Sequence, residues 1–119
     1  MKLYSVLIYE LNTYNLLYKY FNLNDFLFYI RWKIEEGIIE VTNKIVRNMN
    51  NEKFYQIEEK IGDMEFKVYI CQIDNKIYIA LTDDKYPSCV VLQMFTNKNL
   101  EQDIQKYNDP TQISSIAKV

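Results

Sequence analysis

The apolar positions near the N-terminus predict two strands. Lys2–Tyr9 is almost wholly apolar and rich in Leu, Val, Ile and Tyr. A short run bounded this tightly is typical of a central strand that is buried on both faces. Asn12-Thr13 has the character of a turn, and Tyr14–Phe21 follows as a second predicted strand.

The segment Ile34–Met49 has the periodicity of an amphipathic helix. Its apolar residues recur every three or four positions and form one stripe, namely Ile34, Ile38, Val41, Ile45 and Met49. A second apolar stripe, made of Trp32, Ile39 and Val46, lies roughly 100° round the helix from the first. The apolar arc is therefore wider than packing against one sheet requires.

Three further strands are predicted at Lys53–Ile61, Glu65–Ile73 and Lys76–Thr82. The middle one alternates, with Phe66, Val68 and Ile70 on one side and Lys67, Tyr69 and Cys71 on the other. Asp74-Asn75 suits a two-residue hairpin turn.

The rest of the chain predicts helices. Ser88–Phe95 favours a helix, although its β-branched pair leaves a strand open, and Leu100, Ile104 and Tyr107 mark another helix. Asp109 and Pro110 suit the start of a new one. The predicted fold is α+β, with a five-stranded antiparallel sheet sandwiched between a helix on one face and helices on the other.

Composition narrows the class of protein. A length of 119 residues fits one domain, and an apolar fraction of 49% argues against disorder. A net charge of -2 gives no electrostatic case for nucleic acid. We see no signal peptide and no apolar stretch of about 20 residues, so a cytoplasmic protein is expected, with Cys71 and Cys89 as free thiols.

The residues of catalysis are scarce. With no His, neither a His-based triad nor the usual zinc ligand sets can form. The two glycines, Gly37 and Gly62, cannot make a phosphate-binding loop. Cys89 could be activated at a helix start, but no base lies near it in sequence. We therefore expect no enzyme activity, no metal and no cofactor.

Several segments resemble longin domains, the N-terminal modules of certain R-SNAREs. They are Met1–Ser5 (first strand), Phe26–Arg31 (an aromatic-aromatic-Arg stretch before the first helix), Ile57–Glu59 and Val68–Tyr69 (strands), Leu81–Pro87 (a strand and its Tyr-Pro turn) and Ile104–Gln112 with Ile116–Val119 (the junction with the SNARE motif). Together they are most similar to the lipid-anchored, prenylated and palmitoylated longin R-SNARE. On this reading residues 1–108 form a longin domain and residues 109–119 begin a SNARE motif.

The chain departs from the family in two respects. The segment Ser88–Lys106 is shorter than the family usually has. The central part of the SNARE motif and a C-terminal Cys for lipid attachment are missing. Because heptad-like spacing begins at Ile113 and Ile116, we interpret the chain as the truncated front of a longer R-SNARE.

The resemblance implies a longin/profilin-like fold and a regulatory function in vesicle-mediated transport and membrane fusion. Such a domain binds its own SNARE motif, a lipid acyl chain, or both, and so holds a closed, autoinhibited form and contributes to targeting. Cognate Q-SNAREs would bind through the missing motif. The resemblance further implies a monomeric lipoprotein that is peripheral to ER, Golgi, endosomal or vacuolar membranes.

This mechanism requires a hydrophobic groove. The residues predicted to line it are those of the second stripe with the apolar residues around it, namely Phe26, Phe28, Trp32, Ile39, Val46, Phe54 and Ile57. The competing interpretation is that they complete the core. For the whole chain, the alternatives are a longin-like adaptor or tethering-complex subunit of vesicle trafficking and, more remotely, a profilin-like ligand-binding domain or small enzyme.

Overall fold

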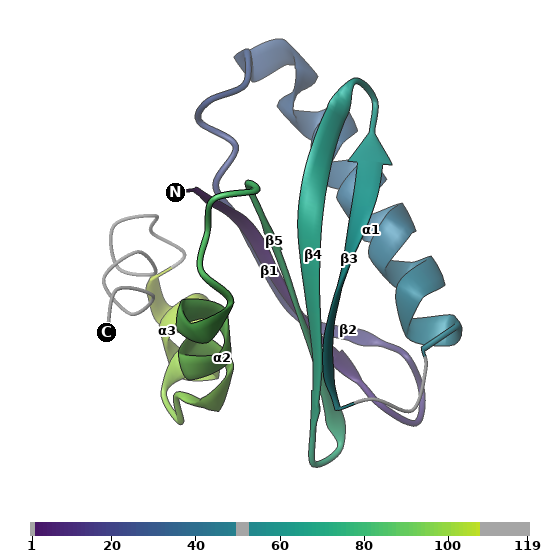
Figure 1. The fold of residues 1–119 in the computed structure, drawn as a ribbon, viewed down its shortest axis with the longest axis vertical. Helices are drawn as coiled ribbons and strands as arrows, with labels where there is room; N and C mark the ends of the chain where they lie inside the picture. The colour runs from purple at the N-terminus through teal and green to yellow at the C-terminus, as the bar shows by residue number, and fades with distance from the viewer. Residues whose placement is uncertain (1, 50–52, 108–119) are drawn as a thin grey trace.

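The structure, a computed structural model, describes residues 2–49 and 53–107 (Figure 1). Their order along the chain is β1 (Leu3–Glu10), β2 (Leu16–Phe21), a 3-10 turn η1 (Phe28–Ile30), α1 (Arg31–Arg47), β3 (Phe54–Ile61), β4 (Met64–Ile73), β5 (Lys76–Thr82), α2 (Ser88–Thr96) and α3 (Leu100–Tyr107). The α+β class is thus confirmed.

The strands form one sheet in the order β2-β1-β5-β4-β3, and every neighbouring pair is antiparallel. The nearly all-apolar strands β1 and β5 lie at the centre, as their composition predicts. Ile73 pairs with Lys76 across the predicted two-residue turn, where Asp74 adopts a φ of 54°. Gly62, with a φ of 61°, makes the matching turn between β3 and β4.

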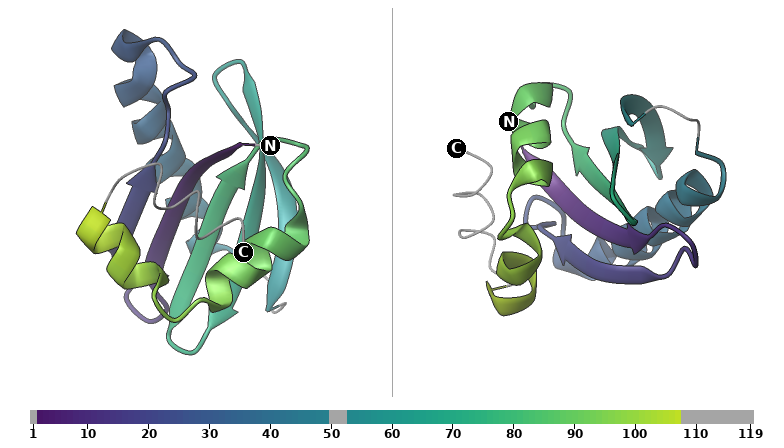
Figure 2. Two further views of the ribbon diagram at one scale, coloured as in Figure 1. Left: turned by 90° about the vertical axis from the view of Figure 1, so that its left-hand side faces the viewer. Right: turned by 90° about the horizontal axis from the view of Figure 1, so that it is seen from below.

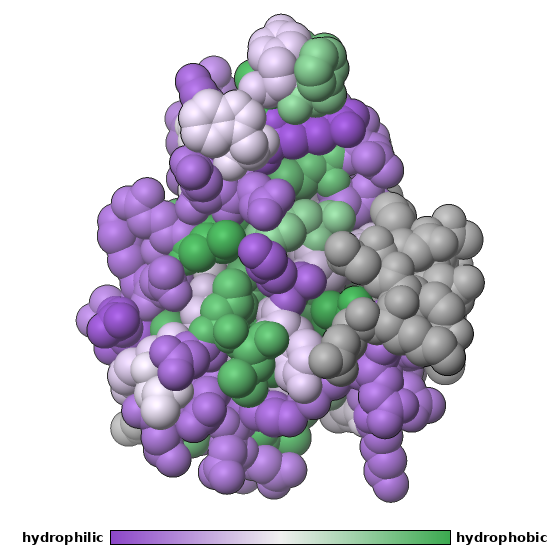
Figure 3. Space-filling view, turned by 180° about the vertical axis from the view of Figure 1, so that it is seen from behind, coloured by the Kyte–Doolittle hydropathy of each residue, from purple (hydrophilic) through white to green (hydrophobic). Residues whose placement is uncertain are grey.

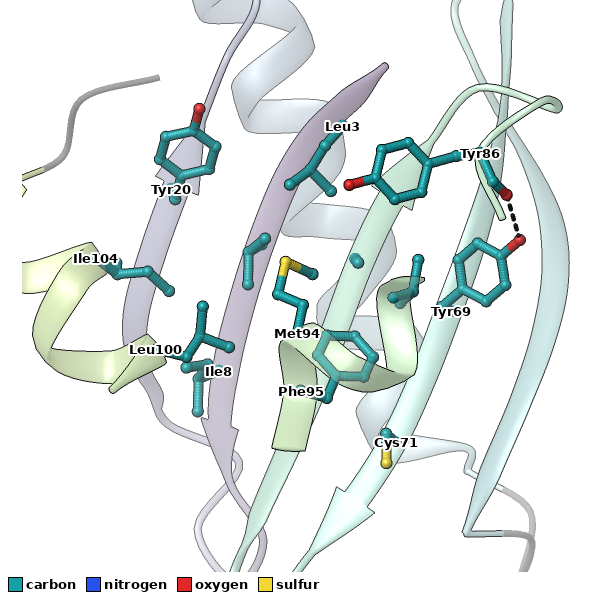
Figure 4. Packing of buried hydrophobic residues seen from close by; sticks show 13 residues of the cluster. Leu3, Ile8, Tyr20, Tyr69, Cys71, Tyr86, Met94, Phe95, Leu100 and Ile104 are labelled. Carbon is teal, nitrogen blue, oxygen red and sulfur yellow. Dashed lines mark hydrogen bonds between the residues drawn. The ribbon is translucent and has the colours of Figure 1, made fainter. Parts of the chain in front are cut away.

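Helix α1 lies on one face of the sheet, and α2 and α3 lie on the other (Figures 1 and 2). Beneath α1 the apolar cluster includes Leu7, Tyr9, Phe66, Val68, Ile70, Ile79, Ile38 and Val46. On the other face (Figure 4) it includes Val6, Ile8, Tyr69, Cys71, Met94, Phe95, Leu100 and Ile104. The predicted alternation along β4 is therefore confirmed, since its odd and even positions belong to different clusters.

Two predicted element starts were wrong by two residues or more, and one alternative is settled. The second strand begins at Leu16 rather than Tyr14, because Tyr14 adopts a φ of 59° in the turn after β1. Helix α1 begins at Arg31, so Trp32 belongs to it. Ser88–Thr96 is a helix and not a strand.

Three predictions concern residues that the structure does not describe. The domain boundary at residue 108, the start of a SNARE motif in 109–119 and a helix through Ile113 and Ile116 lie outside the described residues. Within residues 2–49 and 53–107, no helix combines the length and apolar character needed to cross a membrane.

Candidate functional site: a groove between α1 and β3

The groove begins where α1 touches the edge strand β3. At Gly37 the helix comes so close that a Cβ atom would lie 2.7 Å from Cγ2 of Ile61. The glycine therefore permits contact at this end of the pair. Farther along, Val41 and Ile45 follow Gly37 at steps of four residues and lie on the same side of the helix.

Beyond this contact the two elements enclose a groove of about 560 Å³. Its lining residues are Val41, Lys44, Ile45 and Asn48 from α1 and Tyr55, Ile57, Glu59 and Lys60 from β3. The apolar ones are buried (Ile45) or half-buried (Val41, Tyr55, Ile57), whereas the two lysines are exposed. The groove thus has a largely apolar floor, to which β3 also contributes the half-buried Glu59, and the two lysines lie at its rim.

The rim is tied to the end of the helix. The Asn48 side chain donates a hydrogen bond from Nδ2 to the Lys44 carbonyl (2.9 Å), and its backbone N–H donates to Ile45 (3.1 Å). Lys44 also pairs with Glu40, at 3.5 Å between Nζ and Oε1. The last turn of α1 is therefore capped by the side chain and the backbone N–H of Asn48, one of the residues that line the groove.

Of the seven predicted groove residues, only Ile57 lines this groove. Val46 is 2% exposed in the cluster beneath α1, so the core interpretation holds for it. Ile39 is partly buried against the same cluster. The groove follows the first stripe, through Val41 and Ile45, rather than the second.

Phe54 lies on the other face of the sheet. It stands three positions before Ile57, and residues an odd number of positions apart on a strand point to opposite faces. Its ring stacks on Tyr69, with centroids 6.1 Å apart, in the cluster beneath α2 and α3. The prediction that both residues line one groove is therefore wrong.

The remaining three lie near the other end of α1. Phe26 points inward, with ring centroids 5.7 Å from Tyr4 and 6.5 Å from Phe66. Phe28 and Trp32 point outward and are 77% and 56% exposed. The seven residues therefore divide among the core, the groove, the opposite face and an exposed tip.

Three apolar lining residues, Val41, Ile45 and Tyr55, were not among those predicted. A signal for two of them was present in the sequence. Gly37 is an unusual residue for a helix interior, where it costs about 1 kcal/mol relative to Ala. A glycine at such a position favours a close approach of the helix backbone to a neighbouring element, and the residues at steps of four from it flank that approach.

The described residues contain no group of three or more His, Cys, Asp or Glu side chains placed to hold a metal ion. Cys71 and Cys89 are both free. Cys71 is buried beneath α2 and α3, and burial raises the pKa of its thiol, whereas Cys89 is exposed in the first turn of α2.

A scan against protein-family models and a search of curated proteins found no match for this sequence. The function is therefore inferred from the fold, the groove and the segments that resemble longin domains.

Proposed function

We propose that this chain is a regulatory domain of the longin type, from an R-SNARE of vesicle-mediated transport. In this proposal the groove between α1 and β3 binds the SNARE motif of the longer protein, a lipid acyl chain, or both. The bound form is the closed, autoinhibited one. The domain acts without catalysis, on the cytosolic side of trafficking membranes.

The single observation that carries the proposal is the apolar groove beside an edge strand. Ile57, Tyr55 and Val41 remain half-buried there, so an occupant would remove their apolar surface from water. A volume of about 560 Å³ lies within the range of pockets that hold ligands of several apolar groups. Amphipathic helices bind grooves of this kind through apolar side chains on one face.

The fold and the quoted segments support the same proposal. A five-stranded antiparallel sheet with α1 on one face and two helices on the other is compatible with a longin/profilin-like arrangement. The segment Phe26–Arg31 leads into α1, and Leu81–Pro87 joins the end of β5 to α2. Their places beside α1 and between β5 and α2 support the proposal.

Regulation would follow from a difference in affinity. A ligand shifts a closed and an open population only by the difference between its free energies of binding to the two. An acyl chain gains about 0.8 kcal/mol for each methylene that it buries, so even a short stretch in the groove would favour closure. Lys44 and Lys60 at the rim would then face the polar end of the occupant.

The test is a titration followed by NMR shifts and calorimetry. The probes are a synthetic peptide carrying an R-SNARE motif and the same peptide with a palmitoyl chain. We expect saturable binding that shifts Val41, Ile45, Tyr55 and Ile57. Replacing Ile57 by Ser should weaken binding about tenfold, because the apolar surface that Ile57 buries against the ligand is then removed.

The matched control is Leu92→Ser, which removes an apolar side chain that is 39% exposed on α2, on the opposite face of the sheet. It should leave the affinity unchanged. If neither probe binds, or if both variants weaken binding equally, the groove is not the site. The adaptor-subunit alternative would then be favoured, and recovery of the chain in a stable complex would test it.

A further inference from the structure

The strongest feature outside the groove is an exposed apolar cluster where η1 passes into α1. We call it the aromatic tip, and it consists of Leu27, Phe28, Tyr29 and Trp32, which are 59%, 77%, 59% and 56% exposed. The other exposed large hydrophobic residues in the described chain, Tyr14, Leu17, Met64 and Leu92, are each 37–39% exposed. The tip therefore concentrates the most exposed apolar side chains in one turn of chain.

The tip is held in place from below. Arg31 donates from Nε to the Phe26 carbonyl (2.9 Å) and from Nη2 to the Asn24 carbonyl (3.3 Å), which ties the preceding loop to the start of α1. The backbone N–H of Ile30 donates to the Leu27 carbonyl (3.0 Å). The Phe26 ring packs inward against Tyr4 and Phe66, while the four side chains of the tip remain exposed.

The tip projects from one end of the molecule. Figure 1 and the left view of Figure 2 both place η1 and the start of α1 at the top of the longest axis. In Figure 3 pale and green side chains protrude at this end rather than lining a hollow. The surface is convex, and it is separated along α1 from the groove beside Val41 and Ile45.

Its chemistry matches the interface of a lipid bilayer. Between Asp25 and Glu35 the chain has two cations, Arg31 and Lys33, and no acidic residue. Trp and Tyr rings favour the headgroup level, and Leu and Phe favour the acyl boundary just below it. Lys33 Nζ lies 5.7 Å from the centroid of the Trp32 ring, so a cation accompanies the tip.

We propose that the aromatic tip inserts into the headgroup region of a membrane and that Lys33 favours anionic lipid. A convex tip does not need a preformed pocket in a membrane, because the lipids of a fluid interface can rearrange around it. The proposal does not depend on the function proposed for the groove. One weak membrane contact is reversible, so the tip would orient the domain on a bilayer and not anchor it permanently.

Trp32 is the only Trp in the chain and reports directly on the tip. The experiment titrates the 119-residue chain with vesicles of phosphatidylcholine, with and without phosphatidylserine, and follows Trp emission. We expect a blue shift with both vesicles, stronger with phosphatidylserine, and quenching by lipids brominated near the headgroup. Quenching depth then separates insertion from adsorption.

The test variant Leu27→Ser/Phe28→Ser should weaken partitioning by about tenfold or more, because two apolar side chains no longer enter the interface. Leu17→Ser on β2, 39% exposed, is the control and should partition as the parent does. Lys33→Glu should weaken binding to phosphatidylserine vesicles and change binding to phosphatidylcholine much less. Circular dichroism confirms that each variant is folded.

Three outcomes would overturn the proposal. The first is Trp32 emission that does not change at any lipid concentration. The second is binding that needs phosphatidylserine but is the same for Leu27→Ser/Phe28→Ser as for the parent, since surface charge alone would then explain it. The third is a blue shift without lipid that grows with protein concentration, which would assign the tip to contact between two copies of the chain.

Discussion

Gly37 of α1 lies directly against the Ile61 side chain of β3. A Cβ atom on Gly37 would lie 2.7 Å from Cγ2 of Ile61, which is closer than a real Cβ atom approaches a neighbour. That methyl group is attached directly to the Ile61 Cβ atom, so it cannot move aside as the end of a long side chain could. The contact therefore sets how near the helix comes to the strand at one end of the groove.

A double-mutant cycle on this pair tests the contact. Ala is favoured over Gly in a helix interior by about 1 kcal/mol, but overpacking costs about 1–3 kcal/mol. We expect Gly37→Ala to lower the free energy of unfolding by about 1 kcal/mol in the parent and to raise it by about 1 kcal/mol in an Ile61→Ala background. Urea denaturation measures both. An identical effect in the two backgrounds would show that the methyl group is not the obstacle.

A buried pair of hydroxyl groups joins α1 to β1. The Tyr9 and Thr42 oxygens are 2.6 Å apart, and Thr42 donates to the Ile39 carbonyl at 3.1 Å. Since Thr42 has one proton, Tyr9 must be the donor between them. Thr42→Val would leave the buried Tyr9 hydroxyl without its acceptor.

We expect Thr42→Val to cost about 1–3 kcal/mol of unfolding free energy and Tyr9→Phe about 1 kcal/mol, because the Phe variant leaves no orphaned donor. The double variant should cost less than the sum of the two. Chemical denaturation of the four proteins checks the cycle. Simple additivity would mean that the two hydroxyl groups do not depend on one another.

The strands were predictable from the sequence where the spacing of apolar residues and the residues of the turns indicate the same element. The alternation of Phe66, Val68 and Ile70 with Tyr69 and Cys71 placed β4 between two cores, and both clusters contain the expected side chains. Such patterns follow from the pleat of a strand alone, so no knowledge of the packing partner is needed.

The groove could not be assigned in the same way. The width of the apolar arc on α1 does not say where the helix sits across the sheet. Because α1 lies over the β3 edge, Val41 and Ile45 of the first stripe border the groove, while Val46 of the second stripe is buried. Phe54 was misplaced for a simpler reason, since its odd spacing from Ile57 already puts it on the opposite face.

The second stripe is expected to respond unevenly to substitution. Trp32 is 56% exposed and Val46 is 2% exposed, although they stand on the same helix. We expect Trp32→Ser to change the free energy of unfolding by less than about 0.5 kcal/mol and Val46→Ala to lower it by about 2 kcal/mol. Thermal and urea unfolding compare the two. A large loss of unfolding free energy in Trp32→Ser would instead indicate that Trp32 is part of the core.

Buried tyrosines predict a loss of stability at high pH. Burial, with Asp83 nearby, raises the pKa of Tyr86 from 10.0 to about 12, and burial, with a hydrogen bond to Glu101, does the same for Tyr78. The folded state therefore holds these protons at a pH where the unfolded chain has released them. The stability they contribute is fully present below pH 10 and is lost as the pH rises toward about 12.

Urea midpoints measured across that range should fall, together with the appearance of tyrosinate absorbance. Tyr86→Phe should flatten the decline, since it removes one titrating group while the Tyr86 carbonyl that accepts from Tyr69 (3.2 Å, Figure 4) is retained. Tyr29→Phe, which removes a phenol that is 59% exposed, is the control. A decline that Tyr86→Phe leaves unchanged would assign the effect to other groups.

Glu101 connects α3 to the sheet through two strand residues. Its Oε1 atom lies 2.6 Å from Lys76 Nζ and accepts from the Tyr78 hydroxyl at 3.1 Å. The Lys76 and Glu101 side chains are only 36% and 24% exposed, whereas Lys44 and Glu40 on α1 are 73% and 71% exposed. Water screens the α1 pair more strongly, so the Lys76–Glu101 pair should contribute more to the free energy of unfolding than the Lys44–Glu40 pair does.

We expect Glu101→Ala to lower the free energy of unfolding by about 1 kcal/mol, after allowance for its partial exposure, and Glu40→Ala by about 0.3–0.5 kcal/mol. Hydrogen exchange should locate the first effect, because the amides of α3 would exchange faster in Glu101→Ala while those of α1 would not. High salt should narrow the difference between parent and Glu40→Ala more than that between parent and Glu101→Ala. Equal losses in the two variants would mean that the Glu101 contacts stabilise the protein no more than an exposed ion pair does.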